Sequence, residues 1–220
     1  MAKITPAKPF LLMLYGFPGS GKTYFARQLS DKVQLAHIQA DRIRAELFET
    51  PRYDKQENDV VMQLMNYMAG EFLSAGLSVV YDVNMMRASQ RRVMRDMARK
   101  AHVQPLLVWL QIDTDSAYTR GQKRDRRRVD DRYAAQLDRN SFDSIASHMQ
   151  NPSNAEDYVV ISGKHVFNTQ YAAVQRKMRD LGLINLGDSG THLAKPELVN
   201  LVPNPTAGRV DMSRRNIIIR

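Results

Sequence analysis

The chain has 220 residues and carries 32 Lys and Arg against 23 Asp and Glu, a formal net charge of +9. It has no cysteine, which excludes disulfides and thiolate metal sites and suits a cytoplasmic protein. No stretch approaches the ~20 apolar residues of a membrane span, and residues 1–6 lack the apolar core of a signal peptide. The excess of positive charge favours phosphate-rich ligands, nucleic acid among them, without selecting one.

Residues 10–15 form an apolar run that predicts a first strand, and residues 16–23 match the phosphate-binding loop (P-loop) pattern G-x-x-x-x-G-K-[ST] at every position. Residues 23–29 then predict a helix, whose N-terminal partial positive charge favours bound phosphate. In such a loop Lys22 reaches the β- and γ-phosphates and the Thr23 hydroxyl ligates Mg²⁺. We therefore predict binding of ATP and Mg²⁺ by Gly16, Pro18, Gly19, Ser20, Gly21, Lys22 and Thr23.

An acidic and a basic residue follow the second predicted strand, 33–40. They are Asp41 and Arg44, at the start of a helix predicted over 41–48 with Asp41 as its N-cap. Ligands of parallel sheets gather at the carboxyl ends of strands. A carboxylate there can take the proton of an acceptor hydroxyl, and an arginine one turn on can hold another phosphate of the acceptor. The alternative is that Asp41 only caps the helix and that Arg44 is solvated.

Residues 57–75 have apolar positions at three- and four-residue steps and predict an amphipathic helix that Gly76 ends. The apolar run 77–82 then predicts a buried parallel strand that ends in an acid, Asp82. Asp82 can orient Mg²⁺ or bind the acceptor together with nearby Asn84 and Arg87, or it can cap the next helix.

Residues 86–101 predict a helix with a core stripe and a second stripe of arginines, Arg87, Arg91, Arg95 and Arg99. The arginine stripe is either a solvated face or a track for nucleic acid. Residues 105–112 predict the fourth strand. Two helices are expected over 118–128 and 130–150, around an arginine-rich joint.

A lid is predicted over about 114–132. Arg120 and Arg124 stand one helical turn apart if the predicted helix forms, so both can point at an ATP phosphate when the lid folds over the site. Residues 157–161 predict a fifth strand and residues 167–181 a last helix.

This alternation of strands and helices predicts an α/β domain over 1–181, with a parallel sheet and helices on both faces. Residues 182–220 contain several Pro and Gly and predict an extended or partly ordered tail. The five histidines are dispersed and lack the spacing of metal ligands.

The order of the P-loop, Asp41-x-x-Arg44, Asp82 with Asn84 and the Arg120-x-x-x-Arg124 lid resembles P-loop kinases, a group that includes polynucleotide 5′-kinases and zeta-toxin-like kinases. The likeness covers about residues 10–181. It implies the P-loop kinase fold, with a central, mostly parallel five-stranded sheet and an arginine-rich lid. It also implies that Asp41 is the general base for the acceptor hydroxyl, that Arg44 binds the adjacent phosphate, and that both lid arginines hold ATP.

We expect an ATP- and Mg²⁺-dependent kinase whose acceptor is the 5′-hydroxyl of RNA or DNA. A second interpretation keeps the kinase but gives it a small acceptor, such as a nucleotide-sugar or another metabolite. A third makes the chain a nucleotide-gated binding protein with weak ATPase activity, whose tail forms the partner surface.

Overall fold

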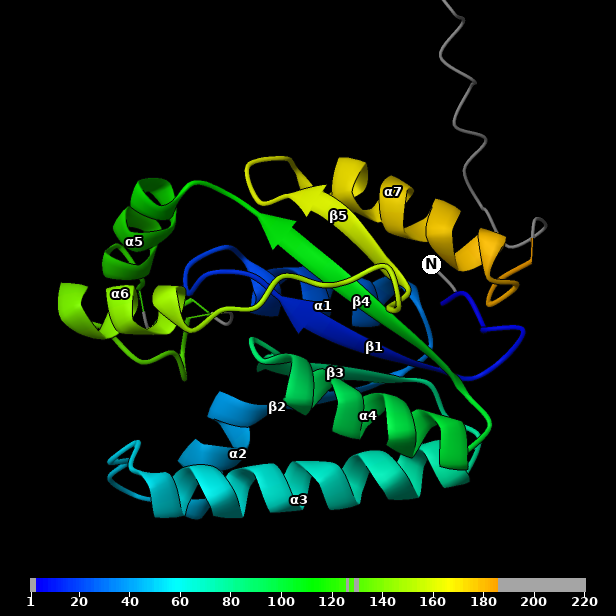
Figure 1. The fold of residues 1–220 in the computed structure, drawn as a ribbon, viewed down its shortest axis with the longest axis horizontal. Helices are drawn as coiled ribbons and strands as arrows, with labels where there is room; N and C mark the ends of the chain where they lie inside the picture. Colours follow the sequence, from blue (N-terminus) through cyan, green and yellow to red (C-terminus); the bar gives the residue numbers. More distant parts are fainter. Residues whose placement is uncertain (1–2, 126, 129–130, 186–220) are drawn as a thin grey trace, which may run out of the picture. The chain divides into compact units, whose positions relative to one another are not determined.

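The computed structural model describes residues 3–125, 127–128 and 131–185. Five strands form one sheet in the order β2-β3-β1-β4-β5, and every neighbouring pair is parallel (Figure 1). The predicted five-stranded sheet is therefore confirmed, and it is wholly parallel. The strands are β1 Phe10–Tyr15, β2 Ala36–Gln39, β3 Val79–Asn84, β4 Gln104–Gln111 and β5 Tyr158–Ser162.

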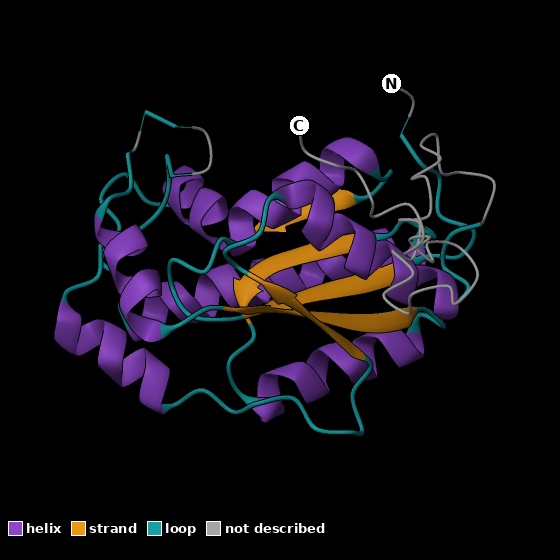
Figure 2. Cartoon of the chain, turned by 90° about the horizontal axis from the view of Figure 1, so that it is seen from above, coloured by secondary structure: helices purple, strands orange, loops and turns teal. Residues whose placement is uncertain are grey.

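Helices cover both faces of the sheet, as Figure 2 shows. One face packs on α1 and α7, and the other on α2, α3 and α4. Two further helices, α5 and α6, lie beyond the carboxyl ends of the strands (Figure 1). The helices are α1 Lys22–Lys32, α2 Ala40–Leu47, α3 Lys55–Ser74, α4 Ala88–Lys100, α5 Thr114–Gln122, α6 Arg139–Ser147 and α7 Phe167–Asp180.

The central strand, β1, is buried along its whole length, which explains why it reads as a continuous apolar run. Successive side chains of a strand point to opposite faces. Phe10, Leu12 and Leu14 accordingly join the core under α1 and α7. Leu11, Met13 and Tyr15 join the core under α3 and α4. Burial of both faces fixes the position of β1, and the P-loop leaves its end.

The second strand is shorter than predicted, because α1 continues to Lys32 and Val33 closes that helix as its C-cap. Helix α2 follows β2 without a loop, and its N-cap is Gln39. The prediction that Asp41 caps this helix is therefore wrong. Asp41 lies inside the first turn of α2 instead, which frees its side chain from the capping role.

Helices predicted over 118–128 and 130–150 exist, but their bounds differ. Helix α5 begins earlier because the carboxylate of Asp113 accepts a hydrogen bond from the backbone N–H of Ser116 at 2.8 Å. Asp138 caps α6 in the same way. These caps set both helix starts, and neither had been recognised in the sequence.

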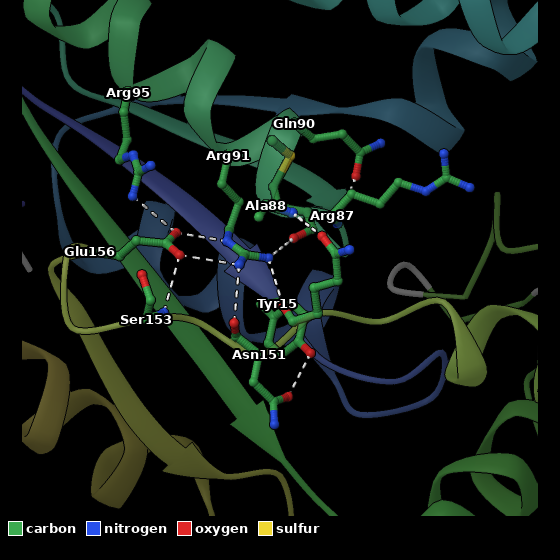
Figure 3. Close-up of polar contacts among 11 residues, drawn as sticks. Tyr15, Arg87, Ala88, Gln90, Arg91, Arg95, Asn151, Ser153 and Glu156 are labelled. Carbon is green, nitrogen blue, oxygen red and sulfur yellow. Dashed lines mark hydrogen bonds and ion pairs between the residues drawn. The ribbon is translucent and has the colours of Figure 1, made fainter.

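A buried arginine joins α4 to the segment that leads into β5. The guanidinium of Arg91 is fully buried and donates to both carboxylate oxygens of Glu156, at 2.7 and 3.1 Å (Figure 3). It also donates to the carbonyl oxygens of Met85 at 3.0 Å, Gln150 at 2.9 Å and Asn151 at 3.4 Å. One side chain thus ties the end of β3 and the segment 150–156 to α4.

The predicted arginine stripe on α4 is therefore neither a solvated face nor a continuous track for nucleic acid. Arg91 is in the core, and Arg95 lies 3.4 Å from the same Glu156 carboxylate. Arg99 is exposed and pairs with Asp96 at 2.8 Å. Helical periodicity predicts that these arginines lie on one side of α4. It does not predict that the segment 150–156 covers part of that side.

Leu183 and Ile184, which fall in the predicted tail, are buried in the core under α7. The backbone N–H of Ala7 donates to the carbonyl oxygen of Leu183 at 2.8 Å. The rest of that tail, residues 186–220, lies outside the described residues. Among the helices of the described ranges, none is long and apolar enough to cross a membrane.

The Arg91–Glu156 pair makes a testable contribution to stability. Removing one partner of a buried ion pair leaves an uncompensated charge, so Glu156→Gln should lower the free energy of unfolding by about 3–5 kcal/mol. Asp96→Asn, which breaks the exposed pair with Arg99, should cost no more than about 1 kcal/mol. Urea unfolding followed by circular dichroism measures both. Equal effects of the two variants would contradict the role given to the buried pair.

Candidate functional site

The P-loop wraps around the N-terminus of α1 with the backbone that its glycines allow. Gly19 and Gly21 have φ of 85° and 96°, in the left-handed region that favours glycine. The hydroxyl oxygen of Ser20 is buried and has no hydrogen-bond partner among the described residues. The Nζ of Lys22 donates to the carbonyl oxygens of Gly16 and Phe17, both at 2.8 Å. A lysine held inside the loop and an unsatisfied hydroxyl fit a phosphate ligand.

The carboxylate of Asp82 reaches the helix that starts at the P-loop. The pairing of β3 with β1 shifts register after Met13, which leaves Asp82 without a partner on β1. Such irregularities re-aim side chains. One carboxylate oxygen of Asp82 accepts a hydrogen bond from the Thr23 hydroxyl at 3.3 Å, and the other lies 3.0 Å from Nε2 of His37. Thr23 and Asp82, both predicted metal ligands, are thus neighbours, and their oxygens are donors that Mg²⁺ prefers.

Asp41 and Lys22 have pKa values displaced toward each other. Burial raises the pKa of Asp41 above its ordinary value, and nearby Asp82 raises it further, while Arg124, Arg44 and Lys22 oppose the shift. Burial lowers the pKa of Lys22 to about 8. The charge of Asp82 opposes this shift, the charge of Arg124 adds to it, and the charge of Asp41 opposes it. These couplings place two carboxylates, the P-loop lysine and a lid arginine in one electrostatic neighbourhood. Displaced pKa values of this kind gather at functional sites.

Arg44 is committed to partners inside the protein. It is 5% exposed, and its guanidinium donates to a carboxylate oxygen of Glu57 at 3.0 Å. The guanidinium also lies over the ring of Tyr53, 4.7 Å from its centroid. Although burial acts to raise the pKa of Glu57, hydrogen bonds from the backbone N–H groups of Arg52 and Tyr53 and from Arg44 hold it below its ordinary value. Arg44 therefore organises the turn between α2 and α3.

The other two predicted acceptor ligands, Asn84 and Arg87, lie in different surroundings. Oδ1 of Asn84 accepts a hydrogen bond from the backbone N–H of Gly16 at 3.4 Å, so Asn84 touches the first residue of the P-loop. Arg87 is exposed at the N-terminus of α4, and its guanidinium points away from the Arg91 network (Figure 3).

The two predicted lid arginines do not share a helical face, because α5 ends at Gln122. Arg120 donates to the carbonyl oxygen of Gly163 at 2.7 Å, in the loop after β5. Arg124 lies beyond the helix and donates to the carbonyl oxygen of Ala135 at 2.8 Å. The charge of Arg124 acts on the pKa values of both Lys22 and Asp41, so this predicted lid arginine contributes to the electrostatics of the P-loop lysine.

Sequence reasoning missed two site features. His37, one of the five dispersed histidines, contacts Asp82, and its position on β2, the neighbour of the strand that contains Asp82, was the available signal. Glu57 was taken only as the start of a helix, although it is 2% exposed and holds Arg44. No sequence pattern marked that pair, since its members come from different helices.

A family model described as an AAA domain (AAA_33) matches residues 11–152, more than half of the chain. No curated protein matches this sequence.

Solved structures share the fold at low sequence identity. A sugar kinase from Janibacter sp. HTCC2649 has a TM-score of 0.58 and 15% identity, over 80% of this chain and 95% of that chain. Kti12 from Chaetomium thermophilum in complex with ADP-AlF3 has a TM-score of 0.59 and 14% identity, over 80% and 99%. The APS kinase from Mycobacterium tuberculosis, in complex with AMPPNP and APS, has a TM-score of 0.57 and 18% identity, over 79% and 99%. The expected α/β P-loop kinase fold is confirmed.

The close approach of α5 to the P-loop makes Gly19 a sharp test of this geometry. A Cβ at Gly19 would lie 2.1 Å from the carbonyl oxygen of Ala117, whereas a Cβ at Gly76, which also has a positive φ of 76°, would meet no atom within 4 Å. Gly76→Ala should therefore lower the free energy of unfolding only by the backbone strain of a non-glycine residue at this φ, about 1–3 kcal/mol. Gly19→Ala should lower it clearly more in urea unfolding, because α5 must also move. A smaller loss for Gly19→Ala would contradict the packing described here.

Proposed function

The chain belongs to the AAA domain family AAA_33, and we propose that it is an ATP-dependent phosphotransferase that moves the γ-phosphate of ATP to a hydroxyl group. The acceptor we propose is the 5′-hydroxyl of a polynucleotide. Phosphoryl transfer needs a clamped phosphate, a positioned acceptor and positive charge near the transferring group. Lys22 and Arg124 would supply the charge, and the P-loop backbone would supply the clamp.

The observation that carries the proposal is the placement of Asp41. Its carboxylate is coupled to Lys22, Asp82 and Arg124, and burial raises its pKa. A carboxylate with a raised pKa accepts a proton more readily, so Asp41 suits the role of the base for the acceptor hydroxyl. Asp41 stands at the carboxyl end of β2, next to β3 and Asp82.

Two ligands for a magnesium ion are already adjacent. Thr23 and Asp82 would hold Mg²⁺, whose charge offsets that of the phosphates when it is bound. His37 contacts the other oxygen of the Asp82 carboxylate and so fixes the direction in which that carboxylate points.

A second candidate keeps the reaction but gives it a small acceptor. Arg44, the residue expected to hold a neighbouring phosphate of a polynucleotide, is bound to Glu57. The similar structures include a sugar kinase and an APS kinase, which act on small molecules by their names. The net charge of +9 favours the polynucleotide, and the pairing of Arg44 favours the small acceptor.

A transfer assay separates the candidates. The protein is incubated with Mg²⁺, ATP labelled at the γ-phosphate, and 5′-hydroxyl oligoribonucleotides, oligodeoxynucleotides, nucleosides, nucleotide-sugars or sugars, with water as the control. Label on an oligonucleotide supports the polynucleotide acceptor, and its affinity should fall with salt by a log–log slope of about −0.7 per phosphate contacted. Label only on a small acceptor supports the second candidate instead of the polynucleotide. Free phosphate alone would contradict phosphoryl transfer to the hydroxyl of any acceptor in the assay.

Asp41→Asn tests the proposed base. The amide has nearly the same shape but cannot accept the proton, so we expect kcat to fall by about 10²–10⁴-fold while ATP affinity stays within a few-fold. Asp59→Asn, an exposed acid on α3, is the matched control and should leave kcat unchanged. Transfer at an undiminished rate in the Asp41 variant would remove Asp41 from this role.

Lys22 makes the reaction sensitive to alkaline pH. Its pKa is lowered to about 8 in the free protein, so its positive charge is present below that pH and is lost as the pH rises through it. We expect kcat/KM for ATP, which reports groups of the free enzyme, to decline above pH 8. In Lys22→Arg the guanidinium stays charged, so ATP affinity measured by calorimetry should lose this alkaline decline. A wild-type profile that stays flat to pH 9.5 would contradict the lowered pKa.

A further inference from the structure

A cavity of about 250 Å³ lies beside the P-loop, on the sheet face that α3 and α4 cover. It is distinct from the cluster of Asp41, Asp82 and Lys22, since none of those residues lines it. It is lined by Tyr15 at the end of β1, by Trp109 and Gln111 of β4, and by Phe17 of the P-loop. Met149 and Asn151, from the segment after α6, also line it.

Two residues of the cavity wall, Tyr15 and Asn151, belong to the polar network of Figure 3. The segment that follows α6 crosses β4 in front of the sheet (Figure 1). Arg91 holds the carbonyl oxygens of Gln150 and Asn151 in this segment. The hydroxyl of Tyr15 donates to Oδ1 of Asn151 at 2.9 Å. Walls fixed in this way form a pocket before any ligand arrives.

The lining predicts the chemistry of the ligand. Three aromatic rings and a methionine contribute apolar surface, and the Trp109 ring meets Tyr15 edge-on, with centroids 5.5 Å apart and planes at 75°. Gln111 and Asn151 contribute amide groups, and no charged side chain lines the cavity within the described part of the chain. A phosphate or a carboxylate would lose its hydration here without gaining a cation. A flat, neutral ring with polar edges can stack on the aromatic groups and pair with the amides.

We propose that this cavity binds a nucleobase of the acceptor. The inference rests on the proposed function and narrows it to acceptors that carry a base, excluding plain sugars. Gly16 lines the cavity and also donates its backbone N–H to Asn84, at the carboxyl end of β3. The cavity therefore adjoins the P-loop, through Gly16, and the carboxyl end of β3, through the contact of Gly16 with Asn84.

Trp109 is the only tryptophan of the chain, so its fluorescence reports on the cavity directly. The full-length protein is titrated, without ATP, with a 5′-hydroxyl oligonucleotide and with an abasic oligonucleotide that has the same number of phosphates. We expect saturable quenching with the first and little or none with the second, because only the base stacks on the indole.

Ala146→Phe fills the cavity from α6, and Ser144→Phe places the same ring on an exposed position of the same helix. The first should raise the Kd of the oligonucleotide by about 5- to 150-fold, which corresponds to the loss of roughly 1–3 kcal/mol of stacking by one base. The second should leave it unchanged. Met149→Ala, which removes part of the wall without adding bulk, should weaken binding in the same direction if the Phe variant does not fold.

The outcomes separate this inference from the proposed function. Transfer of phosphate to an oligonucleotide without any change in Trp109 fluorescence, or with equal quenching by the abasic chain, would overturn the base pocket and leave the phosphotransferase intact. Quenching by ATP but not by the acceptor would assign the cavity to the donor's adenine and would also overturn it. Quenching by the base-bearing chain, weakened in Ala146→Phe, supports the pocket even if no phosphate is transferred.

Discussion

A buried charge is costly unless it has a partner, and this constraint organises the whole carboxyl edge of the sheet. Arg91 is paired with Glu156, and Arg44 with Glu57, in each case within hydrogen-bond distance. Near the P-loop, Asp41 and Lys22 differ from these two ion pairs. The pKa of Asp41 is raised above its ordinary value, and the pKa of Lys22 is lowered below its ordinary value. The two ion pairs stabilise the framework, whereas the two groups with shifted pKa values lie where we propose the reaction.

The framework pairs have consequences for the site. Arg91 anchors α4 to the segment that crosses β4, and this segment supplies Asn151 to the hydroxyl of Tyr15. Tyr15 is the last residue of β1, directly before the P-loop. Arg91 also lies over the ring of Tyr15, 5.4 Å from its centroid, so the structural ion pair adjoins the residue that precedes the phosphate-binding loop. Tyr15 and Asn151 of this network also line the cavity beside that loop.

The arginines of this chain lie in different surroundings, so their roles differ although the residue type is the same. Arg44 lies under the turn that follows α2, Arg120 bonds the loop after β5, and Arg124 lies near Lys22. A positive net charge favours phosphate-rich ligands, yet the buried arginines add nothing to the surface that such a ligand meets. Attraction of a phosphate-rich ligand therefore depends on the exposed cations, whereas the aromatic cavity would act on a base through stacking.

The local features could be predicted from the amino-acid sequence: the first strand, the P-loop and the helix after it, the parallel α/β order, and the acids at the ends of the predicted strands. Each depends on neighbouring residues, through an apolar run, a glycine pattern or a turn. The burial of Arg44 and Arg91, the contact of His37 with Asp82 and the end of α5 before Arg124 became clear in the folded structure. The three contacts depend on partners 13 to 65 residues away, such as Glu57 for Arg44 and Glu156 for Arg91. Helical or strand periodicity cannot specify them, because it places a side chain on a face without saying what covers that face.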